Sequence, residues 1–457
     1  MSQDKRPLIP SAPGASLVMQ TAERVLALAT AMVPGAGVFV RARQGRSANT
    51  RFALNEITTT GDVSESGISV EISLGRRHAA AESNQTDDAS VRALIDRAAT
   101  MARLAPEDPE LMPLLPRQSY EVAASDYDVH TAELSATERA EAIKIAVDPA
   151  DAARLQTAGF FVHDAVERAY ANSAGLRVWH ASSSADFTVT ARTRDGTGSG
   201  WAGTEVIRAS EIDAAALAKT ATDKATSSAN PQKLEPGRYT VVLEPAAVAD
   251  LLAFLTEAFE ARAADEGRSF FSKAGGGTRV GEKIFADAVT LETNPMDPET
   301  PGAPFDDEGL PIKATKWIDR GVATALNYSR YWAAKKGTAP TGQCAIAKLY
   351  GGTAARQQDL YAGIQRGLLV TRFWYTRWLD PKAVVITGLT RDGVFLIEDG
   401  KITKPVQNFR FNESPVTMLK NVDMMTTATV RVPRGGLWRV PALRTHDFNF
   451  ASVSAAV

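Results

Sequence analysis

Apolar residues recur with two different periods along this chain. Several segments carry them three or four positions apart, the period of an amphipathic helix. In residues 88–104, for example, Val91, Leu94, Ile95 and Ala98 fall on one side. This pattern predicts helices over residues 16–32, 88–104, 135–147, 211–228, 246–264 and 414–421.

Other segments alternate apolar and polar residues, the period of a strand with one face in solvent. This pattern predicts strands over residues 37–43, 51–57, 67–74, 157–162, 167–172, 175–180, 187–193, 239–245, 367–373, 384–389, 393–398 and 402–411. Asp392-Gly393 and residues 398–401 are predicted to form turns between the last of these. The glycines of residues 196–201 predict a loop that is mobile or lies close to a ligand.

The order of these elements predicts an α+β protein. We expect a loose arm over residues 1–15, an N-terminal α/β domain with antiparallel sheets over 16–118, and a central α/β segment over 119–232. A β-rich domain is expected over 233–457. The boundaries fall in proline-rich or otherwise linker-like stretches, at 106–118 and 227–237.

Composition narrows the possible functions. The chain has 51 Lys and Arg against 53 Asp and Glu, a net charge of -2, so we expect no nucleic-acid partner. Cys344 is the single cysteine, which rules out an internal disulfide and fits a reducing compartment. Neither a secretory signal nor a membrane-spanning stretch is recognisable, so we expect a cytoplasmic protein without a membrane partner.

Residues 279–342 hold the most distinctive succession of turns. Residues 305–309, Phe-Asp-Asp-Glu-Gly, predict an acidic turn whose glycine can take positive φ. Asp319-Arg320-Gly321 lies between two apolar-alternating runs and predicts a hairpin. The stretch closes on Pro340-Thr341-Gly342.

These blocks, in this order, resemble the TldD/PmbA family of modulators of DNA gyrase, which are also classed as peptidases. The resemblance extends over residues 22–422. It implies a TldD/PmbA-type C-terminal domain. We assign a substrate- or partner-facing role to residues of these blocks, namely Arg279, Glu282, Phe305, Asp306, Asp307, Glu308, Asn327, Tyr328 and Arg330.

The resemblance also implies where a metal would be held in active members. They carry His-Glu-x-x-x-His on the helix after a Val-x-Leu-x-Pro strand, with a cysteine far downstream as a further ligand. Here the equivalent residues 246–259 contain no histidine, none lies between His180 and His446, and Cys344 comes too early. The chain therefore resembles the PmbA/TldE-like branch, which lacks the motif. We expect no cofactor in this chain and zinc in a motif-bearing TldD-like partner.

Four other groups of residues could carry chemistry, each with a simpler explanation that we favour. The carboxylates Glu257, Glu260, Asp265 and Glu266 could bind a metal but suit a solvated helix face. Residues 274–278 could cradle a phosphate but suit a flexible loop. The five histidines suit isolated surface or capping positions. Residues 372–378, aromatic and basic, could grip a peptide or nucleic acid, and we favour an interface strand.

Three functions remain open. The leading one is the non-catalytic, metal-free subunit of a heteromeric metalloprotease that processes peptides or unfolded proteins. The second is a homodimeric peptide-binding or chaperone-like protein without peptidase activity. The third is a metal-independent hydrolase that uses Cys344 as its nucleophile, against which a passive thiol is favoured.

Overall fold

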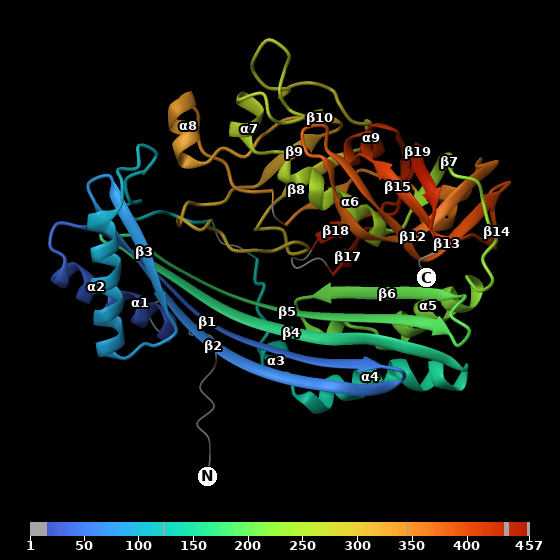
Figure 1. The fold of residues 1–457 in the computed structure, drawn as a ribbon, viewed down its shortest axis with the longest axis horizontal. Coiled ribbons are helices and arrows are strands. Elements are labelled where there is room, and N and C mark those ends of the chain that lie inside the picture. The colour runs from blue at the N-terminus through green and yellow to red at the C-terminus, as the bar shows by residue number, and fades with distance from the viewer. Residues whose placement is uncertain (1–15, 122–123, 345, 434–437, 455–457) are drawn as a thin grey trace.

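The computed structural model describes residues 16–121, 124–344, 346–433 and 438–454; the arm predicted over residues 1–15 lies outside them. An N-terminal antiparallel sheet with helices on its outer face is followed by a C-terminal part built on two further sheets (Figure 1). The predicted α+β class is confirmed.

The first sheet has six antiparallel strands in the order β3-β2-β1-β4-β5-β6. Their bounds are β1 Gly37–Ala53, β2 Glu56–Leu74, β3 Arg77–Ser83, β4 Leu155–Asn172, β5 Arg177–Thr193 and β6 Ser199–Val206. The sheet is continuous across the predicted domain boundary at residue 118, because β1 pairs with β4 along its length from Phe39 to Ala53.

Segments predicted as separate short strands are joined into long ones. Residues 37–43 and 51–57 belong to one hairpin, whose turn is at Leu54 and Asn55, both at positive φ. The polar middle of β1 shows no apolar alternation, yet its backbone pairs with β2 on one side and β4 on the other. Neighbouring strands, not local sequence, hold this stretch extended.

Helices cover the outer face of this sheet, and Figure 1 shows α3 and α4 on the side away from the C-terminal part. Their bounds are α1 Leu17–Met32, α2 Asp88–Leu104, α3 Val129–Ala132, α4 Ala136–Ala152 and α5 Ala214–Ser227, with a short 3-10 helix, η2, at Ala209–Glu211. Helices α1 and α2 pack on residues such as Val40 and Val70, whereas α4 and α5 pack on Phe52 and Phe187.

The glycine-rich stretch 196–201 is predicted to be a loop that is mobile or lies close to a ligand, and only residues 196–198 lie outside the strands. Ser199 begins β6, and a Cβ on Gly200 would lie 2.2 Å from the carbonyl oxygen of Ala221 in α5. The glycine is needed because helix and strand approach each other closely there.

The C-terminal part contains two sheets. One has the order β10-β9-β8-β11-β18-β17, and in the other β12-β7-β19-β15-β13 is closed by a β12–β13 pairing, with β14 and β16 attached. The bounds of the first are β8 Thr290–Thr293, β9 Thr315–Asp319, β10 Val322–Ala323, β11 Lys348–Tyr350, β17 Val430–Val432 and β18 Trp438–Val440. Those of the second are β7 Gly237–Leu243, β12 Arg366–Asp380, β13 Val385–Glu398, β14 Lys401–Pro405, β15 Phe409–Glu413, β16 Val422–Met425 and β19 Leu443–Val453.

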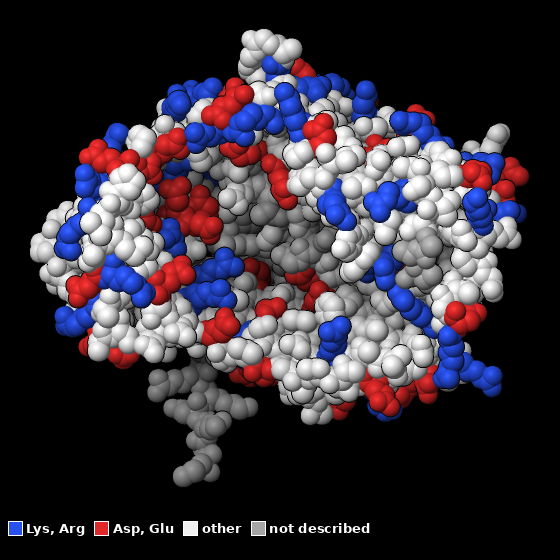
Figure 2. All heavy atoms as spheres, viewed as in Figure 1, with Lys and Arg blue, Asp and Glu red and all other residues white. Residues whose placement is uncertain are grey.

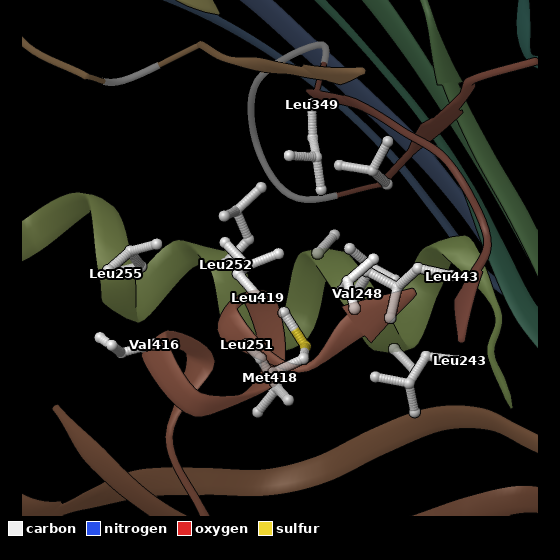
Figure 3. Close-up of a cluster of buried hydrophobic side chains, with 14 of the residues drawn as sticks. Leu243, Val248, Leu251, Leu252, Leu255, Leu349, Val416, Met418, Leu419 and Leu443 are labelled. Atoms are coloured by element: carbon white, nitrogen blue, oxygen red, sulfur yellow. The ribbon is translucent and has the colours of Figure 1, made fainter. Parts of the chain in front are cut away.

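The helices of the C-terminal part are short. They are α6 Pro245–Glu257, α7 Ala261–Asp265, α8 Arg330–Lys336, α9 Pro415–Lys420 and the 3-10 helix η3 Gln357–Tyr361. The single helix predicted over residues 246–264 is broken, because the Glu260 carboxylate accepts hydrogen bonds from the backbone N–H groups of Arg262 and Ala263 and caps a new helix there. Side chains of α6 and α9 meet in the largest apolar core (Figure 3).

Candidate functional site

A cavity of about 1000 Å³ separates the inner face of the first sheet from the C-terminal part. This volume lies at the upper end of the range of small-molecule and peptide sites. Side chains of β1, β4, β5 and β6 form one wall, and the start of α6 with β12 and β13 forms the other. Figure 2 shows the molecule hollowed between these two parts, with charged side chains of both signs around the hollow.

Arginines and tryptophans gather at one end of the cavity. The Arg372 guanidinium carbon lies 4.7 Å from the ring centroid of Trp201 and 5.4 Å from that of Trp374, and the Arg391 carbon lies 5.0 Å from Trp374. The buried Asp392 carboxylate is 3.7 Å from Arg372 Nε and 3.9 Å from Arg391 Nε. Both distances exceed hydrogen-bond length, so one carboxylate only partly neutralises this group.

The position of Asp392 depends on an irregularity in β13, where the sequence predicts a turn. Asp392-Gly393 forms no turn: β13 continues through it, with φ of 57° and 117° at the two residues. The register with β12 shifts beside it, between Val370 and Arg372. This irregularity aims the carboxylate at the cavity, where Ser199 Oγ donates to it at 2.6 Å.

Carboxyl groups gather at the other end. Asp186 Oδ1 is buried and has no hydrogen-bond partner within the described residues. Its neighbours on the same face of the sheet are Glu205, paired with it across β5 and β6, and Asp164 on β4. Burial, with the charges of Glu205 and Asp164, raises the pKa of Asp186 to about 7.

Helix α6 begins at the cavity and then enters the core. Its Asp250 lines the cavity and accepts a hydrogen bond of 2.7 Å from the backbone N–H of Phe373. Val248, Leu251 and Leu252 are fully buried against α9 and neighbouring strands (Figure 3). Within the residues that the structure describes, no three His, Cys, Asp or Glu side chains are grouped so as to hold a metal ion. The described residues therefore do not supply the three or four grouped ligands that a zinc ion needs.

Models of the PmbA/TldA metallopeptidase family match most of the chain. Domain 1 matches residues 38–102, the central domain 126–229 and the C-terminal domain 236–452. The chain belongs to the TldD/PmbA family. The resemblance of the turn blocks is thereby confirmed.

Solved structures of the family share the fold across almost the whole chain. TldE from Thermococcus kodakarensis superposes with a TM-score of 0.84 at 19% identity, covering 94% of this chain and 100% of its own. Two proteins named putative modulators of DNA gyrase are similar. The Thermotoga maritima protein has a TM-score of 0.83 at 16% identity (94% and 99% covered), and the Bacteroides thetaiotaomicron protein 0.82 at 20% (95% and 98%).

No curated protein matches the sequence. Among the helices in the described ranges, none is long and apolar enough to cross a membrane.

The acidic turn of residues 305–309 packs against the inner face of the first sheet through Phe305, while Asp307 is exposed. Phe305 is 5% exposed and packs on Tyr120, Tyr170 and His180. The Asp306 carboxylate closes the turn by accepting from the backbone N–H groups of Glu308 and Leu310 at 2.9 Å. Burial raises the pKa of Asp306.

The other residues of this turn also contact the N-terminal part. The Asp307 carbonyl accepts from Arg41 Nε at 3.2 Å. Glu308 pairs with Arg330 at 2.6 Å, and Arg330 also donates to the Pro113 carbonyl. These contacts join the two parts of the chain. A role for Asp307, Glu308 or Arg330 towards a substrate stays a prediction.

The remaining predicted residues lie apart from the cavity wall. Arg279 and Lys273 both pair with Glu282. Asn327 makes backbone hydrogen bonds with Phe259 and Ala261, and the Tyr328 N–H donates to Thr341 Oγ1. The cavity lining does not include the four predicted residues Arg279, Glu282, Asn327 and Tyr328, and their predicted roles remain predictions.

Cys344 is buried, and burial raises the pKa of its thiol far above the ordinary value. The thiol therefore stays protonated at neutral pH, which opposes a role as nucleophile. Three of the four carboxylates considered as a metal group have other partners in the structure. Glu260 caps α7, Asp265 contacts Trp332 and Lys336, and Glu266 pairs with Arg262 and Arg268.

The aromatic and basic run 372–378 lies in β12, and the structure places Arg372 and Trp374 in the cavity wall. The favoured interpretation, an interface strand, did not anticipate this position. Tyr375 lies on the same strand and is 65% exposed.

Two histidines are not at the surface, contrary to expectation. His180 is nearly buried, with Nε2 3.0 Å from Asp126 Oδ2. His163 is fully buried on the outer face of the sheet, where Arg139 donates to its Nδ1 at 3.4 Å. Its Nε2 has no hydrogen-bond partner within the described residues. Burial, and then the charge of Arg139, lower the pKa of His163 to about 4.

We expect His163 to make the protein sensitive to acid. Between pH 6.5 and 4 the unfolded chain binds a proton that the folded chain excludes, so stability falls as pH falls through this window, by about 3 kcal/mol. His163→Gln should remove this contribution. The difference in unfolding free energy between wild type and variant, measured by urea titration at pH 7 and pH 4, should change by that amount. A constant difference would contradict the assignment.

Proposed function

We propose that this chain is the metal-free, non-catalytic subunit of a heteromeric metallopeptidase. A homologue bearing His-Glu-x-x-x-His would hold the zinc and cut the peptide bond. This chain would bind and present the peptide, and the assembly would work in the cytoplasm. Family membership alone does not assign this role, because members that share a fold can differ in activity.

The observation that carries the proposal is the composition and packing of α6. In motif-bearing members the resemblance places the metal ligands on this helix. Here the helix keeps its position beside the cavity, but its side chains are those of a core element: Leu251, Leu252 and Leu255 are fully buried. Asp250, its one acidic residue before Glu257, is engaged by a backbone N–H. Such a helix supports a cavity without supplying a metal site.

The cavity supports the peptide-binding part of the proposal. Its wall on the first sheet offers Thr188, Thr190 and Gln156, polar groups that can accept and donate hydrogen bonds. The opposite wall offers the flat faces of Trp374 and Arg372. Extended peptides are bound by this combination of polar groups and aromatic surfaces in many proteins.

The two alternatives make different demands. A hydrolase that uses Cys344 needs an accessible thiolate, which the burial of Cys344 opposes. A homodimeric peptide-binding protein is compatible with the cavity, and it differs in predicting a stable symmetric dimer that does not associate with a motif-bearing homologue.

The test is to assay peptide cleavage by the full chain alone and by the complex obtained on co-expression with the motif-bearing homologue of the same cell. We expect no cleavage by the chain alone and cleavage by the complex that a zinc chelator abolishes. Cys344→Ser should leave the activity of the complex unchanged. Chelator-sensitive cleavage by the isolated chain would overturn the proposal, and failure to form a complex would favour the homodimer.

A further inference from the structure

The two ends of the cavity carry opposite charge along a single strand. Asp186 and Arg192 both lie on β5, six positions apart, and both line the cavity. Residues an even number apart on a strand share a face, and six residues span about 20 Å. Thr188 and Thr190 lie between them on the same face.

The basic end suits a carboxylate. Arg192, Arg372 and Arg391 all line the cavity. Burial lowers the pKa of Arg391, as do the charges of the other two arginines, while the Asp392 carboxylate opposes this shift. The Asp392 carboxylate lies 3.7 Å from Arg372 Nε and 3.9 Å from Arg391 Nε, beyond hydrogen-bond length. A guanidinium group binds a carboxylate through two parallel hydrogen bonds, and the stacking on Trp201 and Trp374 holds these planes in place.

The acidic end suits an amine. Asp186 Oδ1 is buried without a hydrogen-bond donor, which costs free energy unless a ligand supplies one. Its surroundings, Glu205 and Asp164, add negative charge. No metal-binding group of three such side chains exists among the described residues, so a nitrogen cation fits this end better than a metal ion.

We propose that the cavity takes short peptides with both ends free, with the α-amine at Asp186 and the α-carboxylate at Arg372 and Arg391. About six extended residues span this distance. The inference rests on the proposed function and narrows its substrate class from peptides or unfolded proteins to short peptides. An internal stretch of an unfolded protein carries neither an α-amine nor an α-carboxylate, so it would make neither of these contacts.

The experiment uses a library of random hexapeptides without charged side chains, in three forms: free ends, N-acetylated and C-amidated. Each form is equilibrated with the immobilised full chain, and the retained peptide is quantified by mass spectrometry. We expect acetylation and amidation each to lower retention about tenfold, the effect of losing one charge-assisted hydrogen-bonded end.

Two variants test which residue binds which end of the peptide. Asp186→Asn should abolish the effect of acetylation and keep that of amidation, and Arg391→Gln should do the reverse. Asp223→Asn, an exposed aspartate paired with Lys219 on α5, is the matched control and should behave as wild type. Because an unfolded variant would lose all three peptide forms, the crossed pattern separates binding from folding.

Equal retention of the three forms by wild type would overturn the inference, as would no retention by either the chain or its complex with the motif-bearing homologue. These outcomes are distinct from those of the proposed function. A complex that forms and cuts, but ignores blocked ends, would retain the function and reject the inference. A chain that discriminates between free and blocked ends but binds no homologue would support the inference and reject the proposed function.

Discussion

Asp186→Asn should stabilise the protein by about 4 kcal/mol at pH 8 and by less than about 1 kcal/mol at pH 4. The wild-type carboxyl has its pKa raised from 3.8 to about 7, so the folded chain binds more protons than the unfolded chain between these values. Stability contributed by the protonated group is therefore present below pH 3.8 and is lost as pH rises towards 7. Asparagine has the same shape and no charge to lose. Urea unfolding of both proteins at the two pH values measures the difference.

The same substitution at Asp223 serves as the control. That side chain is 64% exposed and pairs with Lys219 one helical turn away, so we expect a change within about 0.5 kcal/mol at either pH. A gain for Asp186→Asn that is equal at pH 4 and pH 8 would contradict the assignment of a buried carboxylate. A loss at pH 8 would show that Asp186 has a partner in the folded protein.

Phe305→Ala should cost about 3 to 5 kcal/mol, the range for removing a buried aromatic side chain. The ring fills the junction between the acidic turn and the first sheet, with centroids of Tyr170 and Tyr120 at 5.4 and 5.9 Å. Because this junction joins the two parts of the chain, the variant should also unfold in two steps. Calorimetry and urea unfolding followed by tryptophan fluorescence measure both effects.

Phe160→Ala is the matched control, since Phe160 lies on the same face of the sheet but is 41% exposed in the cavity wall. We expect its cost to stay below about 1 kcal/mol, with a single transition. Equal costs for the two substitutions would mean that the turn does not hold the parts together.

Local turn chemistry was predictable wherever one residue determined the backbone. Gly309 takes φ of 85° in the acidic turn, and Asp319-Arg320-Gly321 closes the hairpin of β9 and β10 as expected. The same logic failed at Asp392-Gly393, where positive φ occurs within a strand. The dipeptide Asp-Gly occurs both in turns and in irregular positions within strands. Which of the two forms depends on pairing with the partner strand, which the local sequence does not show.

The candidate cavity could not be predicted because its residues come from distant strands. Asp186 in isolation is an ordinary polar position of an alternating strand. Its pKa is raised first by burial in the folded chain and then by the charges of Glu205 on β6 and Asp164 on β4. The burial of His163 could have been predicted from the sequence, because His163 alternates with Phe161 on the face of β4 that points to the helices.

Zinc analysis tests the central claim most directly. The full chain is purified alone and as a complex with its motif-bearing homologue, and zinc is measured by elemental analysis in each. The proposed role predicts zinc below stoichiometric amounts in the chain alone and one zinc per motif-bearing subunit in the complex. Stoichiometric zinc in the isolated chain would contradict it, since the ligands would then have to come from this chain.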